Sequence, residues 1–179
     1  MLSLVIGGAR SGKSRFAQSL CAAAGRVVYI ATARVEDDEM AARIERHRLD
    51  RPAQWTTVEE PLEIAGAVEC HAAHCDTLLL DCLTIWLSNL CWTHREDDDT
   101  AIQTAALGEL DRIASAAAAS HVVLVTNEVG CGLVPESPLG RRFRDLQGRV
   151  NQEAARSADW VYHVVAGIPV AIKRPEGSR

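Results

Sequence analysis

The sequence predicts an α/β fold in which a mostly parallel sheet is covered by helices on both faces. Short apolar runs rich in β-branched residues alternate along the chain with longer segments of helical periodicity, and such alternation is typical of parallel sheets. A glycine-rich phosphate-binding motif follows the first apolar run. Near residue 170 two apolar runs are separated by only a few residues, which indicates an antiparallel hairpin at the edge of the sheet.

Six runs are predicted to be strands, the last of them a short edge strand. They are LSLVI (2–6), VVYIA (27–31), TLLLD (77–81), VVLVT (122–126), WVYHVV (160–165) and, after GIP, VAIK (170–173). The helical segments lie at about 13–24, 37–49, 61–75, 83–94, 101–119 and 139–157. The charge run REDDDT (95–100) is expected to be a solvated loop that leads into a helix N-terminus. No repeat or linker interrupts the pattern, so one domain spanning residues 1–179 is expected.

The composition excludes several classes of protein. The sequence contains no run of 18 apolar residues, so no transmembrane helix is expected. The opening MLSLVIGG lacks the basic region of a signal peptide, and the six cysteines are therefore expected to be reduced thiols in a cytoplasmic protein. A net charge of −5 gives no broad basic surface for nucleic acid. A small anionic substrate would instead require local positive charge.

The stretch GGARSGKS (7–14) matches the phosphate-binding pattern G-x-x-x-x-G-K-[ST]. In this motif, backbone N–H groups surround phosphate oxygens, the lysine reaches the β and γ phosphates, and the hydroxyl binds Mg²⁺. A glycine-rich turn that binds nothing is the alternative, but the strand before the motif and the helix after it favour phosphate binding. The nucleotide-contacting loop is therefore predicted to comprise Gly7, Gly8, Ala9, Arg10, Ser11, Gly12, Lys13 and Ser14.

Two further positions lie where strands end. Asp81 follows three leucines, in the position of an acidic residue that holds Mg²⁺ beside a phosphate-binding loop; the alternative is that it caps the next helix. Glu128 follows another buried strand, and Gly130 and Gly132 allow unusual backbone geometry there, although an ordinary surface loop is an equal alternative. The stretch CHAAHC (70–75) could bind a metal, but a helix end is favoured.

The other candidate functional residue is His47, which has arginines on both sides in the sequence. Asp37 or Asp38 can cap a helix in which Arg43 and His47 are four residues apart, with Arg51 one turn further on. Neighbouring cations lower the pKa of a histidine and attract polyphosphate, which suits a neutral nucleophile. A solvated helix face explains the same residues. The residues alone leave the two interpretations open.

In order and spacing, six stretches resemble those of the bifunctional adenosylcobinamide kinase/adenosylcobinamide-phosphate guanylyltransferase family of cobalamin biosynthesis. They are GGARSGKS, YIAT, DDEMAARIERHRLDRPAQWTTVEEP, LLLDCLTIWLSNL, VVLVTNEVGCGLVPE and RRFRDLQGRVNQEAA. The resemblance covers the whole chain, and its most specific parts are H-R-x-x-R-P and T-N-E-V-G-x-G-x-V-P. It implies a RecA-like P-loop fold, a homotrimer, and a covalent guanylyl intermediate on His47.

The resemblance also implies two reactions and additional contact residues. ATP or GTP phosphorylates adenosylcobinamide, and GTP then transfers GMP to the product, yielding adenosylcobinamide-GDP and pyrophosphate. Lys13 and His47 are the expected catalytic residues, with Ser14 and Asp81 on Mg²⁺. Further nucleotide contacts are implied for Thr32, Ala33, Arg34, Arg48, Leu49, Asp50, Arg51, Glu59 and Asp81.

Two other functions remain as alternatives. One is a small-molecule kinase without nucleotidyl transfer, and the other is a nucleotide-binding regulatory module. The sequence argues against a conventional GTP switch, because the guanine-reading N-K-x-D motif requires a lysine after an asparagine and neither lysine of the chain follows one, although guanine could be read in another way.

Overall fold

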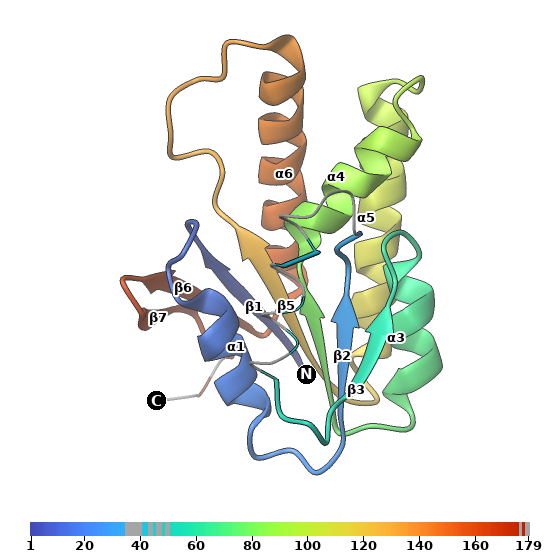
Figure 1. Cartoon of the computed structure of the whole chain (residues 1–179), viewed down its shortest axis with the longest axis vertical. Helices are drawn as coiled ribbons and strands as arrows, with labels where there is room; N and C mark the ends of the chain where they lie inside the picture. The colour runs from blue at the N-terminus through green and yellow to red at the C-terminus, as the bar shows by residue number, and fades with distance from the viewer. Residues whose placement is uncertain (35–40, 43–44, 46–47, 49–50, 176, 178–179) are drawn as a thin grey trace.

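The computed structural model describes residues 1–34, 41–42, 45, 48, 51–175 and 177. Within them, one sheet has the strand order β3-β2-β4-β5-β1-β6-β7 (Figure 1). All neighbouring strands are parallel except β6 and β7, which confirms the predicted sheet and its antiparallel edge. The strands are β1 (Leu2–Gly7), β2 (Val27–Ala31), β3 (Thr56–Glu59), β4 (Thr77–Asp81), β5 (His121–Asn127), β6 (Trp160–Val165) and β7 (Ile168–Lys173).

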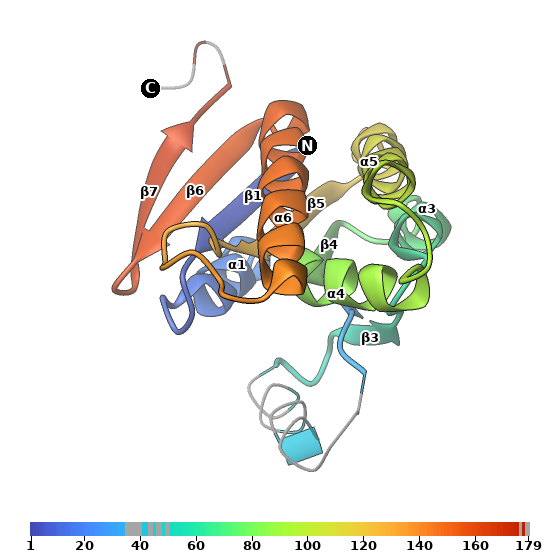
Figure 2. The same ribbon diagram turned by 90° about the horizontal axis from the view of Figure 1, so that it is seen from above.

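Helices cover both faces of this sheet, as Figure 2 shows from above. One face packs against α1, and the other packs against the remaining helices. The described helices are α1 (Lys13–Cys21), α3 (Ile64–Ala72), α4 (Leu83–Thr93), α5 (Asp99–Ala116) and α6 (Pro138–Ser157). None of those in the described part of the chain is both long and apolar enough to cross a membrane.

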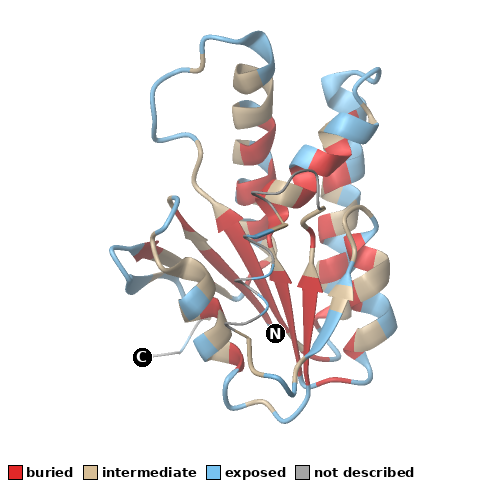
Figure 3. Ribbon diagram, in the orientation of Figure 1, coloured by how far each residue is buried: buried red, intermediate tan, exposed pale blue. Residues whose placement is uncertain are grey.

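The apolar runs form strands because both faces of the central strands are buried (Figure 3). In β1, Leu4 contributes to the core beneath α3, α5 and α6, whereas the next residue, Val5, contributes to the core beneath α1. This alternation explains why the central strands are continuously apolar. The carboxyl ends of the parallel strands lie at one edge of the sheet, where the segment between β5 and α6 rises above them (Figure 1).

Several element boundaries differ from the sequence-based expectations. β3 was not predicted, because its residues TTVE are mostly exposed and polar and form no apolar run. β7 begins at Ile168, two residues before the predicted strand, so the connecting turn is tighter. Residues 41, 42, 45 and 48 are helical. The other residues of the helix predicted at 37–49 lie outside the described part of the chain.

Helix ends agree with the local sequence signals. Asp98, from the charge run, accepts a hydrogen bond from the N–H of Ala101 and caps α5, as expected of a loop that leads into a helix. Ser137 caps α6 in the same way, with Pro138 in the first turn. α3 ends at Ala72, so the CHAAHC stretch is the predicted helix end before β4.

Candidate active site

The phosphate-binding loop connects β1 to α1 at the carboxyl edge of the sheet. Gly12 has φ +93° and directly precedes α1, a conformation that glycine adopts without steric cost. A side chain at Gly7 would place its Cβ 2.6 Å from the carbonyl oxygen of Val164. The turn between β6 and β7 supports the loop, because the N–H of Gly167 donates to the carbonyl of Ser11 at 2.8 Å. The hairpin of β6 and β7 therefore packs against the phosphate-binding loop and supports it.

Lys13 and Ser14 are the first two residues of α1, where N–H groups and the helix dipole favour an anion. The Lys13 ammonium donates to the carbonyl of Gly8 at 3.1 Å, so the side chain folds back over the loop. This position places a cation where the motif requires one. Lys13 and Ser14 both line a cavity of about 630 Å³.

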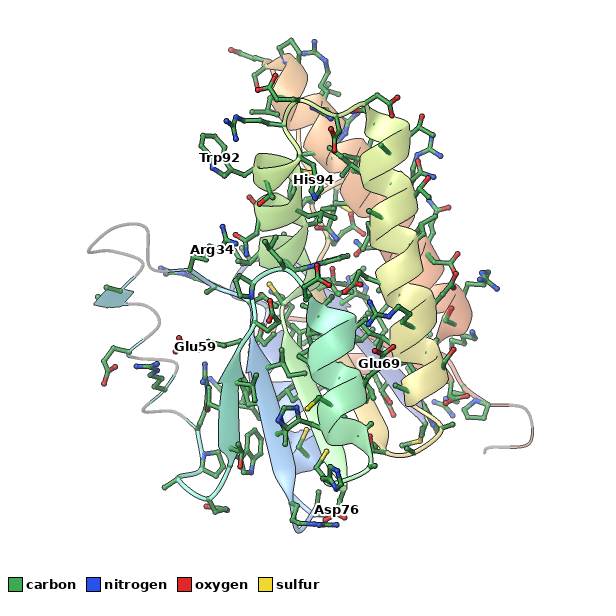
Figure 4. The ribbon with its side chains drawn as sticks, turned by 90° about the vertical axis from the view of Figure 1, so that its right-hand side faces the viewer. Arg34, Glu59, Glu69, Asp76, Trp92 and His94 are labelled. Atoms are coloured by element: carbon green, nitrogen blue, oxygen red, sulfur yellow. The ribbon has the colours of Figure 1, made fainter. Side chains whose placement is uncertain are left out.

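The cavity brings together eight of the predicted residues from distant parts of the chain. The predicted residues that line it are Lys13, Ser14, Ala33, Arg34, Arg48, Arg51, Glu59 and Asp81. Four cations and three carboxylates, those of Glu45, Glu59 and Asp81, line its wall. Figure 4 shows Arg34 and Glu59 on the side of the molecule where β2 and β3 end. A cavity of this size and charge suits a nucleotide with its metal ion.

Thr32 differs from its predicted neighbours, because its side chain is fully buried and does not line the cavity. Its hydroxyl donates to the carbonyl of Cys82 and accepts from the N–H of Cys82, both at 2.9 Å. The Thr32 carbonyl in turn accepts from the Asn89 side chain at 2.8 Å. Thr32 thus ties the segment after β2 to the end of β4, which fixes the positions of Ala33 and Asp81.

Asp81 ends β4 and projects into the cavity. It does not cap α4, because Cys82 is the N-cap residue and no side chain makes the capping hydrogen bond. Instead, the carboxylate accepts a hydrogen bond from the Tyr29 hydroxyl at 3.1 Å. The helix-cap interpretation of Asp81 is therefore wrong.

The residues at this edge fit a magnesium ion bound together with phosphates. Ser14 and Asp81 contribute a hydroxyl and a carboxylate to the same cavity, and both are hard oxygen ligands. Mg²⁺ is usually held by one or two carboxylates plus substrate phosphates. Within the part of the chain that the structure describes, no group of three or more His, Cys, Asp or Glu side chains is arranged to hold a metal, and CHAAHC forms no such group.

Two further arginines, Arg48 and Arg51, line the same cavity. Arg48 forms an ion pair with Glu59 at the end of β3, and the Arg51 guanidinium lies 3.5 Å from the centre of the Tyr29 ring. Both arginines also line a second hollow of about 400 Å³ beside Trp55. His47, Leu49 and Asp50 lie outside the described residues, so their predicted roles remain predictions.

The segment after β5 contributes a residue that the sequence analysis missed. Asn127, not Glu128, lines the cavity. The Asn127 backbone is held by the Thr84 hydroxyl at 2.9 Å and by the Asn151 amide at 3.0 Å. Glu128 instead accepts a hydrogen bond from the N–H of Gly130 at 2.8 Å. Neither Gly130 nor Gly132 has positive φ, so neither adopts the left-handed conformation that glycine allows.

The other cavity residues that the sequence analysis did not predict are mostly apolar, and the polar ones among them contact neighbouring side chains. They are Tyr29, Ala31, Ala41, Glu45, Pro61, Cys82 and Ile85. Burial raises the pKa of Cys82 to about 11, so its thiol stays protonated near neutral pH. Strand position was an available signal for Tyr29: it is the one hydroxyl-bearing residue in the run VVYIA, two residues before the end of the strand.

Comparison with known proteins identifies relatives of similar length. Residues 3–172 match the family model described as cobinamide kinase / cobinamide phosphate guanyltransferase. The bifunctional adenosylcobalamin biosynthesis protein CobU of Escherichia coli is 45% identical over 97% of this chain and 100% of its own length. The corresponding Salmonella typhimurium protein has the same identity and coverage. The bifunctional adenosylcobalamin biosynthesis protein CobP of Pseudomonas aeruginosa is 43% identical over 97% of this chain and 98% of its own length.

A more distant likeness concerns the fold alone. A prototypical ATPase from the type III secretion system of pathogenic bacteria superposes with a TM-score of 0.61 at 10% sequence identity. The match covers 95% of this chain, which spans 56% of that ATPase chain. It agrees with the predicted P-loop NTPase fold.

Proposed function

Because the chain belongs to the cobinamide kinase / cobinamide phosphate guanyltransferase family, we propose that it catalyses two successive steps of adenosylcobalamin biosynthesis. ATP or GTP first phosphorylates the aminopropanol hydroxyl of adenosylcobinamide. GTP then transfers GMP to that phosphate, through a guanylyl group carried on His47, to yield adenosylcobinamide-GDP and pyrophosphate.

One observation carries this proposal. The phosphate-binding Lys13 and Ser14 share a single cavity with Arg48 and Arg51, which flank His47 in sequence. A kinase needs only the first pair. The second pair belongs to the basic segment that carries His47 in the sequence, which supports a second reaction at phosphorus.

In the proposed kinase step, the loop's N–H groups and Lys13 hold the β and γ phosphates and balance the charge that develops on the transferred group. Ser14 and Asp81 would hold Mg²⁺, which neutralises phosphate charge and orients the γ phosphate. In the proposed guanylyl step, Arg48 and Arg51 attract the phosphates and favour the neutral form of His47. The imidazole nitrogen is then free to attack phosphorus.

Product analysis distinguishes this function from its alternatives. The purified protein is incubated with GTP, Mg²⁺ and adenosylcobinamide, and the products are identified by mass. We expect adenosylcobinamide-GDP and pyrophosphate. A kinase without nucleotidyl transfer would release GDP or ADP and no pyrophosphate, and a regulatory module would bind GTP without turnover on the corrinoid.

Replacing Asp81 with asparagine is expected to raise the Mg²⁺ concentration needed for half-maximal rate in both steps by about tenfold, because a charged oxygen ligand becomes a neutral amide. Rates are measured across a Mg²⁺ titration at saturating nucleotide. Asp76→Asn is a control, since Asp76 lies at the opposite edge of the sheet beside Arg26. An unchanged Mg²⁺ titration for Asp81→Asn would exclude Asp81 from the metal site.

The resemblance also supports a proposed homotrimer. Exposed apolar side chains, which oligomers commonly cover, include Leu133 and Ile168. Light scattering after size exclusion is expected to yield about three times the chain mass of 19.4 kDa. A mass equal to that of one chain at micromolar concentration would contradict a stable trimer.

A further inference from the structure

Tyr29 occupies an unusual position in the middle of β2. Its side chain is only 2% exposed, yet it reaches the wall of the nucleotide cavity. The other residues of the strand VVYIA are aliphatic, and an apolar residue would fill the same core position as Tyr29. A buried hydroxyl must find a partner, so the choice of tyrosine calls for a reason.

The hydroxyl supplies the first part of that reason. In the β2–β4 register Tyr29 pairs with Leu79 and Ala31 pairs with Asp81, so the tyrosine lies two residues below the aspartate on the neighbouring strand. From there its hydroxyl donates to Oδ2 of Asp81 at 3.1 Å. A carboxylate oxygen only accepts hydrogen bonds, so the tyrosine hydroxyl is the donor in this contact. Holding one carboxylate oxygen also fixes the direction of the other.

The ring supplies the second part. The guanidinium of Arg51 lies over the ring at 3.5 Å from its centre, within the range of a cation–π contact. Among the described residues, Nη1 of this guanidinium also donates a 3.4 Å hydrogen bond to the Thr57 hydroxyl, and its Nε is buried without a hydrogen-bond partner. Of the described residues, Tyr29 therefore presents the main surface that orients Arg51.

We propose that Tyr29 is a positioning residue that serves both halves of the site: its hydroxyl orients Asp81 for the metal–nucleotide complex, and its ring orients Arg51 for the guanylyl step. The inference rests on the proposed function. A single buried side chain then couples the phosphate-binding edge of the sheet to the segment that follows His47.

Two substitutions separate the two roles. Tyr29→Phe keeps the ring and removes the hydroxyl, so we expect Mn²⁺ to bind about tenfold more weakly in the presence of α,β-methylene-GTP, measured by calorimetry without turnover. The rate of protein labelling from GTP labelled at the α phosphate, at saturating metal, should change less than about threefold. Tyr29→Leu removes the ring as well, and that labelling rate should fall by about tenfold or more.

A double-mutant cycle tests whether the hydroxyl acts through Asp81. In an Asp81→Asn background, Tyr29→Phe should weaken Mn²⁺ binding less than about twofold, because the group that the hydroxyl orients has already been changed. Tyr162→Phe is the matched control: Tyr162 is the chain's other tyrosine, its ring packs against Phe16 and Trp160, and its substitution should leave Mn²⁺ affinity unchanged.

Three results would overturn the inference. They are wild-type Mn²⁺ affinity in Tyr29→Phe, an undiminished effect of that substitution in the Asp81→Asn background, and equal labelling rates in Tyr29→Phe and Tyr29→Leu. If Tyr29→Leu does not fold, as judged by circular dichroism, Arg51→Met takes its place and should reduce labelling to a similar extent. Absence of label in the wild-type protein would count against the proposed guanylyl step instead, whereas the Mn²⁺ titrations would still decide the role of the hydroxyl.

Discussion

Lys13→Ala is expected to reduce phosphorylation of adenosylcobinamide by at least about 10²–10³-fold, because it removes a preorganised cation from the β and γ phosphates. No other lysine of the chain can take its place. The chain has only one other lysine, Lys173, and its ammonium donates to the carbonyls of Ala155 and Arg156 at the end of α6. The measurement is transfer of labelled γ phosphate to the corrinoid.

The control for this prediction is Lys173→Ala, which should phosphorylate adenosylcobinamide at the wild-type rate. Lys13→Arg should not restore the activity fully, because the planar guanidinium presents its donors differently from a compact ammonium. Circular dichroism should show that Lys13→Ala remains folded, since the side chain is only partly buried. Wild-type phosphorylation by a folded Lys13→Ala protein would show that the loop does not serve the kinase step.

The central part of the fold was predictable because strands that are buried on both faces are continuously apolar in sequence. β4 and β5 are continuous apolar runs, and their neighbours are too. β3 contains no apolar run, since it lies at the edge of the sheet and exposes polar threonines. Its pairing with β2 is what makes it a strand. Edge strands depend on tertiary pairing, which periodicity does not encode.

The same distinction applies to the candidate site. The phosphate-binding loop and Asp81 were predictable because each follows an apolar run at a defined spacing. The contacts of Tyr29 were not, because they depend on which strand lies beside β2 and in what register. Asn127 was overlooked for a similar reason: a charged neighbour, Glu128, looked more functional, but the cavity is lined by the residue before it.

His47 carries the other large expected effect, which rests on the proposed guanylyl step. In the proposed guanylyl step, a neutral imidazole nitrogen attacks the α phosphorus of GTP, the bond from that phosphorus to the bridging oxygen breaks, and pyrophosphate leaves. An oxygen of the corrinoid phosphate then attacks the same phosphorus, and the phosphorus–nitrogen bond breaks to regenerate the imidazole. Arg48 and Arg51, which line the cavity, would supply the positive charge that these proposed steps require.

We therefore expect GTP labelled at the α phosphate to label the protein, with release of pyrophosphate, before any corrinoid is added. The label should be lost in acid and retained in alkali, as expected of phosphorus bonded to a histidine nitrogen. His47→Ala should lose the label and at least about 10³-fold of the guanylyl transfer, as when a covalent nucleophile is removed, while it continues to phosphorylate adenosylcobinamide.

The matched control is His74→Ala, since His74 is an exposed histidine between α3 and β4, at the opposite edge of the sheet from the phosphate-binding loop. It should label as the wild type does. The kinase activity of His47→Ala matters as much as its missing label, because it separates loss of the nucleophile from loss of the nucleotide site. Undiminished labelling in His47→Ala, or alkali-labile label in the wild type, would assign His47 to a solvated helix face, and the arginines around it would then serve only to bind phosphate.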